Sequence, residues 1–276
     1  MLGSGLSNQT GASIASLAFP MIGPLGVVAV RQWVAAIVLV AMGRPHLRHF
    51  TAAQWRVVLG LALIYAVMNL SLYAAIERIG LGLAVTLEFL GPLAVALAGS
   101  RRLVNLFCAA AAAGAVAVLM RPTPSTDYAG IGLALLAAMC WACYILLNRE
   151  VGKRLPGLEG SAASALVSGI LYLPVGAWVL WQHPPTLLVL VYAMAAGVLS
   201  SGVPFLADLL ALRRIPAHSF GMFMSVNPVF AALIGLAVLG QRLDAFAWLA
   251  IVVIVSANIV ALSAVQRSAS GTMPAG

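Results

Sequence analysis

Long apolar stretches separated by short polar segments run through the whole chain. A helix needs about 20 mostly apolar residues to cross a bilayer, so each such stretch predicts a transmembrane helix. The predicted spans are residues 2–18, 25–42, 55–76, 79–99, 103–120, 129–147, 161–181, 187–210, 218–239 and 245–264. The pattern predicts an all-α integral membrane protein with ten transmembrane helices. Because the first span is short and rich in Ser, Asn and Gln, we expect part of it to precede Met1.

The fourth span holds a carboxylate and a helix-breaking pair within one apolar stretch. Glu88 lies near its middle, and Gly91-Pro92 follows three residues later. A carboxylate at the centre of a spanning helix costs roughly 2.5–3.5 kcal/mol on insertion scales, and proline frees backbone carbonyl groups that then need new partners. A tolerated kink with a paired acid is one interpretation. Intramembrane acids are functional by default, so a transport or proton-transfer site is the other.

Composition agrees with a membrane protein and argues against other classes. Of 276 residues, 63% are apolar and 8% are charged, whereas soluble domains carry about a quarter charged residues. The net charge of +8 forms no patch, since the cations stand singly or in pairs between apolar stretches, and no nucleic-acid partner is expected. Cys108, Cys140 and Cys143 lie in apolar stretches without a nearby His, so we expect small buried side chains rather than a redox or metal site.

The distribution of cations predicts the orientation in the membrane. Eleven of the 15 Lys and Arg residues lie in the loops after even-numbered spans and in the tail, and three lie in the opposite loops. Arg31 is the remaining one, within the second span. Because cytoplasmic loops carry the excess of cations, both termini are predicted to be cytoplasmic.

An internal repeat relates the two halves of the chain. A shift of 136 residues aligns Pro92 with Pro228 and Gly99 with Gly235, without a gap. Five spans per half is an odd number, so the second copy would be inverted, as in many secondary transporters with helices broken at matching positions. We predict two five-helix halves, residues 1–122 and 126–266, and a cytoplasmic tail, 267–276. Chance similarity between two Ala- and Leu-rich helices is the alternative.

Ten spans in two halves, with prolines in spans four and nine, resemble the drug/metabolite transporter superfamily and its EamA domains. The chain also contains the motifs Phe19-Pro20, Gly26-Val27, Ala29-Val30-Arg31, Met68-Asn69-Leu70, Leu81 to Val85, Leu87-Glu88-Phe89, Gly91 to Leu97, Ser100-Arg101-Arg102, Cys140-Trp141-Ala142, Tyr144-Ile145-Leu146, Leu199-Ser200-Ser201, Pro204, Ser219-Phe220-Gly221, Met224-Ser225 and Pro228. In these motifs it is similar to the threonine/homoserine exporter family within that superfamily.

This resemblance implies a multi-pass protein of the bacterial inner membrane that exports small amino acids such as threonine or homoserine, with protons moving in the opposite direction. The partners implied are the amino acid, protons and the lipid bilayer, with no cofactor and no metal. Asn227 and Gln241 stand where the family tends to have acids, and Asp208 stands where it has Glu. Export of another metabolite or a drug is therefore the alternative.

An amino acid needs an acidic or carbonyl partner for its ammonium group and a donor for its carboxylate, near the middle of the membrane. Glu88 is the leading candidate, to bind the substrate amine, a coupling proton or each in turn, because removal from water favours its protonated form. A fixed structural hydrogen bond is the competing interpretation. The other candidates for the cavity wall are Gln9, Asn69, Tyr73, Trp141, Tyr144, Ser200, Asn227 and Asp208, and the helix-break residues are Gly91, Pro92 and Pro228.

Several candidates have equally simple structural roles. Asp208 is five residues before Arg213, so a local ion pair explains it as well as a site does. Core packing explains Trp141 somewhat better than a cavity wall, and Ser200 could serve backbone groups freed by the following proline. Arg31 lies about one turn inside the predicted second span, so we expect it to snorkel to the surface rather than contact substrate.

Other functional classes lack sequence support. The four His residues lie in or beside loops, no metal-ligand spacing or nucleotide-binding loop is present, and a membrane-embedded enzyme is not expected. A channel or a scaffold without transport activity is a further alternative, distinguished by flux that does not saturate. Small residues in spans four and five permit close packing and would allow a homodimer.

Overall fold

Helices form every element of the described chain, as the apolar pattern predicts. The computed structural model describes residues 2–98, 127–202 and 227–270, with five single positions between 99 and 126. The helices before residue 99 are α1 (Leu2–Ser16), α2 (Phe19–Gly43), η1 (Leu47–His49), α3 (Ala52–Ile79), α4 (Leu81–Glu88) and α5 (Leu90–Ala98). Those after residue 126 are α7 (Tyr128–Arg154), α8 (Glu159–Leu171), α9 (Leu173–Gln182), α10 (Leu187–Gly197), the π-helical η2 (Val198–Gly202), α13 (Asn227–Leu239) and α14 (Ala245–Ser270). Predicted span five, parts of spans eight and nine, Cys108 and Asp208 lie outside these residues, apart from the single positions.

Side-chain caps fix where the long helices begin. Thr51 and Gln54 form a capping box at the start of α3, in which the Gln54 N–H donates to Thr51 Oγ1 at 3.3 Å and the Thr51 N–H donates to Gln54 Oε1 at 2.8 Å. Asp127 caps α7, accepting from the Gly130 N–H at 2.8 Å. These caps satisfy backbone donors that the first turn of a helix leaves without partners.

Prolines and a glycine interrupt the helices that surround the centre of the molecule. Gly23 has φ of 63° and kinks α2 just before Pro24. Helices α8 and α9 bend by 43° at a break of one residue. The break in the fourth span lies at Phe89, between α4 and α5, rather than at Gly91-Pro92. This position follows from the proline, because Pro92 lacks an N–H and its ring clashes with the carbonyl group four residues earlier, at Glu88.

Three described helices are long and apolar enough to cross a membrane by themselves, namely α2, α3 and α7, and the bent pair α8–α9 would make a fourth. Large apolar side chains such as Ile37, Trp178 and Trp181 are 70%, 61% and 86% exposed. Apolar side chains facing outward on long apolar helices are what a lipid environment requires. The chain is a multi-pass membrane protein.

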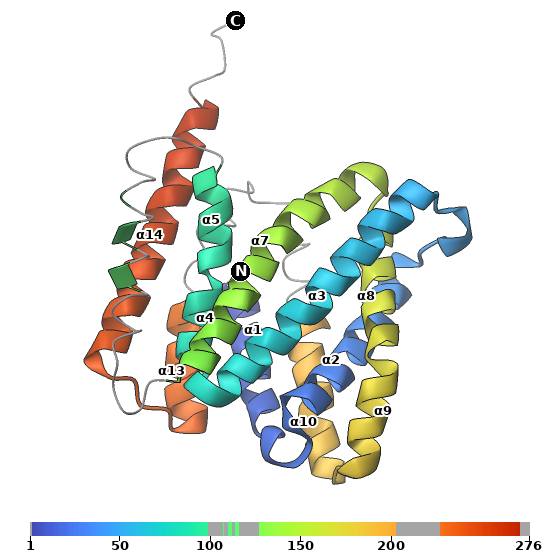
Figure 1. The fold of residues 1–276 in the computed structure, drawn as a ribbon, viewed down its shortest axis with the longest axis horizontal. Coiled ribbons are helices and arrows are strands. Elements are labelled where there is room, and N and C mark those ends of the chain that lie inside the picture. Colours follow the sequence, from blue (N-terminus) through green and yellow to red (C-terminus); the bar gives the residue numbers. More distant parts are fainter. Residues whose placement is uncertain are drawn as a thin grey trace, which may run out of the picture.

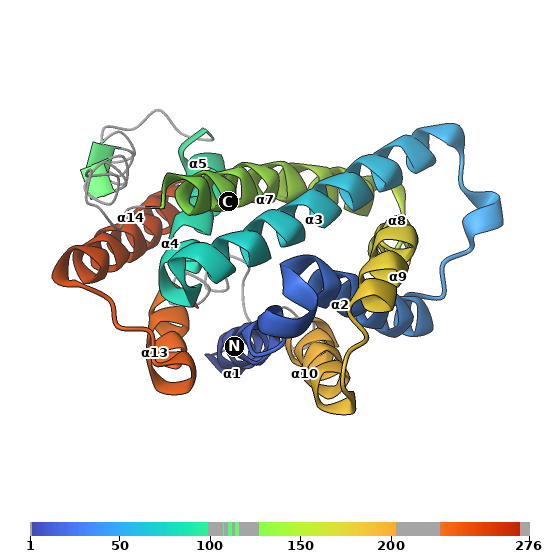
Figure 2. The ribbon, with the colours of Figure 1, turned by 60° about the horizontal axis from the view of Figure 1, so that its bottom comes forward.

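Helices far apart in the sequence lie side by side, with α3 along α7, α2 along α8, α4 against α13, and α1 against α10 (Figure 1). Figure 2 shows α3 and α7 on one side of the molecule and α1, α10 and α13 on the other. The buried core between them includes Tyr73, Ile22 and Leu81. This arrangement brings the middle parts of several helices around one central space.

The contacts between α2 and α8–α9 join residues related by the 136-residue shift. Trp33 Nε1 donates to the Gly169 carbonyl at 3.1 Å, and these residues are 136 apart. A methyl group added to Gly43 would lie 2.7 Å from Ala162 Cβ, and one added to Gly26 would lie 3.1 Å from Val179 Cγ1. Gly26 and Ala162 are 136 residues apart, and so are Gly43 and Val179. The shift therefore relates the Gly26–Val179 contact to the Gly43–Ala162 contact.

Candidate substrate cavity

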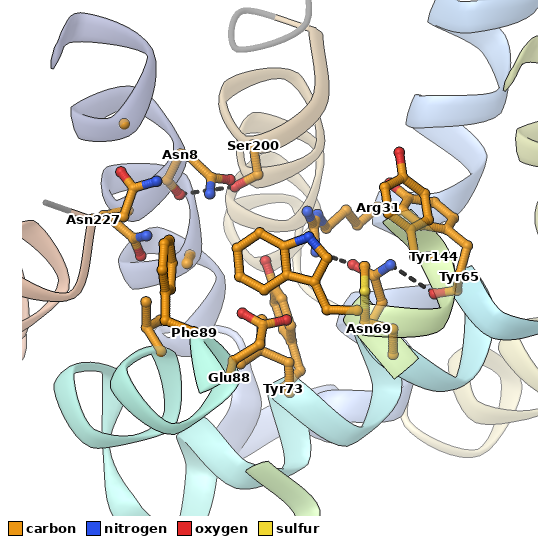
Figure 3. A pocket seen from close by; sticks show the side chains of 17 residues that line it. Asn8, Arg31, Tyr65, Asn69, Tyr73, Glu88, Phe89, Tyr144, Ser200 and Asn227 are labelled. Carbon is orange, nitrogen blue, oxygen red and sulfur yellow. Dashed lines mark hydrogen bonds between the residues drawn. The ribbon is translucent and has the colours of Figure 1, made fainter. Parts of the chain in front are cut away.

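A cavity of about 240 Å³ lies between the helices that the fold brings together. Its walls come from α1, α2, α3, α4, α7, η2 and α13, and Figure 3 shows the side chains that line it. Eight of the nine candidates for the cavity wall line this space: Gln9, Asn69, Tyr73, Glu88, Trp141, Tyr144, Ser200 and Asn227. The ninth, Asp208, lies outside the described residues. The fold thus brings together the candidates that the sequence pattern identified, while their roles remain a prediction.

Glu88 ends α4 with its side chain at the cavity (Figure 3). The residue is 6% exposed, and none of the ion pairs among the described residues includes it. Next to it, the rings of Phe89 and Trp141 meet edge to face at 4.7 Å between centroids. Trp141 is therefore both a packed aromatic residue and part of the cavity wall. A buried carboxyl group without a cation bound to it can take up a proton or a cationic ligand.

Arg31 also lines the cavity, and the prediction that it snorkels to the surface was wrong. The helix that carries it begins at Phe19, six residues before the predicted boundary, which places Arg31 at the middle of α2. Only Leu17 and Ala18 separate α1 from α2, so the second helix starts earlier than its apolar pattern indicated. From mid-helix the side chain cannot reach the surface, and Arg31 is 9% exposed.

Two residues of α3 hold the Arg31 guanidinium group. The Asn69 side-chain amide donates from Nδ2 to the Tyr65 carbonyl group at 2.8 Å, and Arg31 Nη1 donates to Asn69 Oδ1. The guanidinium carbon lies 5.0 Å from the centroid of the Tyr73 ring, in cation–π contact. The Tyr73 ring in turn meets Phe19 edge to face at 6.1 Å. These contacts fix the cation in the cavity wall without neutralising its charge.

The opposite wall is polar but uncharged. Ser200 Oγ donates to the Asn8 carbonyl group at 3.1 Å, joining the π-helical turn η2 to α1. Turns of π-helix within longer helices often mark functional sites. Asn227 begins α13 and is buried beside Gly5, where a methyl group on the glycine would lie 2.2 Å from Asn227 Oδ1. On the same side as Arg31, Tyr144 and Tyr65 add an aromatic wall, at 5.8 Å between ring centroids (Figure 3).

The helix-break residues shape the cavity without lining it. Gly91 lets α5 approach α7, because a Cβ atom there would lie 2.3 Å from the Ala138 carbonyl oxygen. Pro92 places the break directly after Glu88, and Pro228 follows Asn227 in the first turn of α13. Backbone geometry around both prolines thus positions a polar side chain at the cavity.

Sequence reasoning missed Asn8, Tyr65 and Arg31 as polar residues of the cavity. A signal for Tyr65 was present, because it precedes Asn69 and Tyr73 at spacings of four, which place all three on one face of α3. Asn8 adjoins the candidate Gln9. The predicted depth of Arg31 depended on where the second helix begins, and no residue spacing marked Arg31 as part of a cavity wall.

Several charged groups beyond the cavity are paired with one another. Arg78 Nη1 lies 2.9 Å from Asp127 Oδ2, at the end of α3 and the start of α7. The Gly130 N–H, together with Arg78, holds the pKa of the Asp127 carboxyl group below its usual range. Cys140 is buried and Cys143 is half-buried, both as free thiols. Among the described residues, no three His, Cys, Asp or Glu side chains gather in a way that could hold a metal.

Known proteins similar to this chain include exporters of amino acids. The threonine/homoserine exporter RhtA of Salmonella typhimurium (strain SL1344) is 34% identical over 268 residues, covering 95% of this chain and 89% of the relative. RhtA of Escherichia coli (strain K12) is 33% identical with the same coverage. The EamA-like transporter family matches residues 128–263. The chain belongs to the EamA-like transporter family.

Membership in the EamA-like transporter family agrees with the apolar helices and the central cavity. A solved crystal structure that is 18% identical covers 96% of both chains with a TM-score of 0.60, which shows the shared fold. The family identified by resemblance is therefore confirmed, and a membrane exporter is the class that the relatives support.

Proposed function

We propose that this chain exports small amino acids of the threonine and homoserine kind from the cytoplasm, exchanging them for protons across the bacterial inner membrane. The observation that carries the proposal is the buried Glu88 carboxyl group in a central cavity, without an ion-pair partner among the described residues. The names of the RhtA relatives support the cargo.

The size of the cavity favours an amino acid over a larger metabolite or a drug. Its volume is about 240 Å³, below the roughly 300–1,000 Å³ of pockets that hold drug-sized ligands. It exceeds the roughly 150 Å³ of an engineered cavity that binds benzene. A molecule of a few heavy atoms with two charged ends fits this size and this polar wall.

Glu88 would bind the cargo's ammonium group and a proton in turn. Protonation in the outward-open state releases the cargo, and deprotonation towards the cytoplasm readies the carboxylate for the next molecule. One proton moving down a potential of 100 mV releases about 2.3 kcal/mol, enough to drive a useful outward gradient. The second acid expected in this role, Asp208, would add a cytoplasmic relay or a local ion pair.

The architecture we propose is ten transmembrane helices in two inverted repeats with both termini in the cytoplasm. Under the 136-residue shift, α10 is the counterpart of α3, and α7 is the counterpart of α1. Because α3 packs on α7 and α10 packs on α1, the helix contacts agree with a two-fold exchange of the halves. The matched contacts of Gly26 and Gly43 support the same exchange. The cation excess in alternate loops supports the orientation. A homodimer remains a prediction from small residues in the fifth span.

Proteoliposomes with an imposed pH gradient test the function. Radiolabelled L-threonine flux should depend on the gradient and stop when an uncoupler is added, and Glu88→Gln should lower proton-driven flux at least about 100-fold. Glu88→Asp, which keeps a titratable group, should retain partial flux. Unlabelled homoserine, serine and larger metabolites as competitors define the cargo. Proton-driven flux that is unchanged in Glu88→Gln would reject the proposed role of this residue.

A further inference from the structure

Arg31 carries a permanent charge into the centre of the molecule. An Arg side chain remains protonated in proteins, so 9% exposure means that a full positive charge lies in the interior. Glu88 is the acid that lines the same cavity, and no ion pair within the described residues joins the two. The two charges are close enough to interact electrostatically, but a buried charge without a bonded counter-ion is costly, and its bonded partner is expected to be a ligand.

The groups around Arg31 orient it and leave donors available. The Asn69 amide is itself oriented by the Tyr65 carbonyl group, so its oxygen faces Arg31. The Tyr73 ring covers the guanidinium plane on one side. Arg31 Nε is buried with no hydrogen-bond partner within the described chain. The Tyr73 hydroxyl has Arg31 and Ser200 as its polar neighbours. Planar guanidinium donors match the two oxygens of a carboxylate.

We propose that Arg31 binds the carboxylate of the exported molecule, with Asn69 and Tyr73 as its positioning residues. This inference rests on the proposed export function and narrows its cargo to molecules with a free carboxylate and a separate cationic end. The carboxylate lies at Arg31 of α2 and the ammonium group at Glu88 of α4, two helices that reach the cavity from different sides (Figure 3).

The charges of the cavity then select against close analogues. L-threoninamide has the size, hydroxyl and ammonium group of L-threonine but no carboxylate, so it would leave Arg31 without an anion. A site built to bond a polar group rejects analogues that lack it, because its own buried donors lose their partner. We expect threonine to bind at least about tenfold more tightly than threoninamide.

Binding to the purified full-length protein tests this separately from transport. Ligand-induced stabilisation in detergent is measured across concentrations of L-threonine and of L-threoninamide. Arg31→Gln should weaken threonine binding about 10- to 100-fold and leave threoninamide nearly unchanged, which removes the preference. Arg31→Lys, which keeps the charge but not the planar fork, should recover part of it.

Two further variants separate binding from folding. Asn69→Asp keeps Arg31 but places a carboxylate of the protein itself against the guanidinium group. The carboxylate of threonine then has to compete with it, so threonine should no longer bind more tightly than threoninamide. Gln32→Leu is the matched control, since Gln32 is the next residue of α2, is 1% exposed, and does not line the cavity. This control should bind both ligands as the unmodified protein does.

The outcomes distinguish this inference from the proposed function. Equal binding of the two ligands, or an intact preference in Arg31→Gln, overturns the carboxylate site even if proton-driven flux is normal. A preference that Arg31→Gln abolishes supports the site even if no pH gradient drives flux, in which case proton antiport fails. Absence of binding to either ligand overturns both.

Discussion

The two halves of the chain pack in matching ways but give the cavity different chemistry. Helices α2 and α8 meet through residues that are 136 apart. The charged residues of the cavity lack such counterparts: Val167 stands 136 residues beyond Arg31. Met224 stands at the same distance beyond Glu88. In the proposed repeat, the packing is therefore common to both halves, while the charges of the cavity belong to the first half.

Helix packing and ligand binding require different kinds of residues, and the comparison separates the two. Close helix packing needs small and apolar residues in matching places, which both halves supply. Binding a molecule with two charged ends needs one cation and one anion at a fixed separation, and one half suffices for that. The second half contributes the neutral groups of Ser200 and Asn227.

Moving the cavity arginine to the other half is expected to have the largest effect. The double variant Arg31→Val with Val167→Arg keeps the composition and uses the matching helix position. Its proton-driven threonine flux should fall at least about 100-fold, because the new position has no Asn and Tyr side chains to orient the guanidinium group as Asn69 and Tyr73 do for Arg31. At 136 residues beyond Asn69 and Tyr73 the chain has Phe205 and Leu209.

Flux in this double variant is measured in proteoliposomes containing equal amounts of folded protein, judged by a single symmetric peak in size-exclusion chromatography. Arg31→Val alone is the matched control and should be equally inactive. Recovery of flux in the double variant relative to this control would mean that the halves are chemically interchangeable, contrary to the comparison.

Two glycines at close helix contacts are expected to differ in how much an added methyl group destabilises the fold. Gly91 faces the backbone of α7, where a Cβ atom would lie 2.3 Å from the Ala138 carbonyl oxygen. Gly5 faces the end of a side chain, Asn227 Oδ1, at 2.2 Å. Because a side-chain amide can rotate and a helix backbone cannot, Gly91→Ala should cost about 1–3 kcal/mol and Gly5→Ala less than about 1 kcal/mol. Thermal unfolding in detergent measures both, and a larger cost at Gly5 would contradict this reasoning.

Sequence patterns predicted the cavity better than the helix boundaries. Glu88, Asn69 and Asn227 were found because a polar group in an apolar span needs a protein partner or a cavity. Arg31 was misjudged because its depth depended on where α2 begins, and a two-residue connection to α1 leaves no polar loop to mark that point. The break at Phe89 was predicted a few residues late, since proline acts on the carbonyl group four residues before it.

An added methyl group should destabilise the interface of α2 with α8 and α9 at both ends of α2. Gly43→Ala brings a methyl group 2.7 Å from Ala162 Cβ, and Gly26→Ala brings one 2.9 Å from Ile22 Cβ and 3.1 Å from Val179 Cγ1. Both should destabilise by about 1–3 kcal/mol, Gly43→Ala the more, because its added methyl group would also lie 3.0 Å from the Leu158 backbone carbonyl oxygen. Unfolding midpoints of both variants, measured together, test this order. A cost in one variant alone would show that the interface is not equivalent in the two halves.

Charges outside the cavity should affect stability slightly and transport not at all. Asp127 is bonded to the Gly130 N–H and paired with Arg78, which together hold its pKa below the ordinary value. A lowered carboxyl pKa gives stability that is present at neutral pH and is lost as pH falls through that pKa. Asp127→Asn, which keeps the cap acceptor, should lower the unfolding midpoint by at most about 3 °C at pH 7.

The same substitution should make no difference at a low pH below the lowered pKa of Asp127, where the carboxyl group of the unmodified protein is protonated. Asp127→Ala, which also removes the cap, is the comparison variant and should fall further at both pH values. Threonine flux should be unchanged in both variants at pH 7. A loss of flux in Asp127→Asn without a loss of folded protein would place a functional charge outside the cavity, in the Arg78–Asp127 pair.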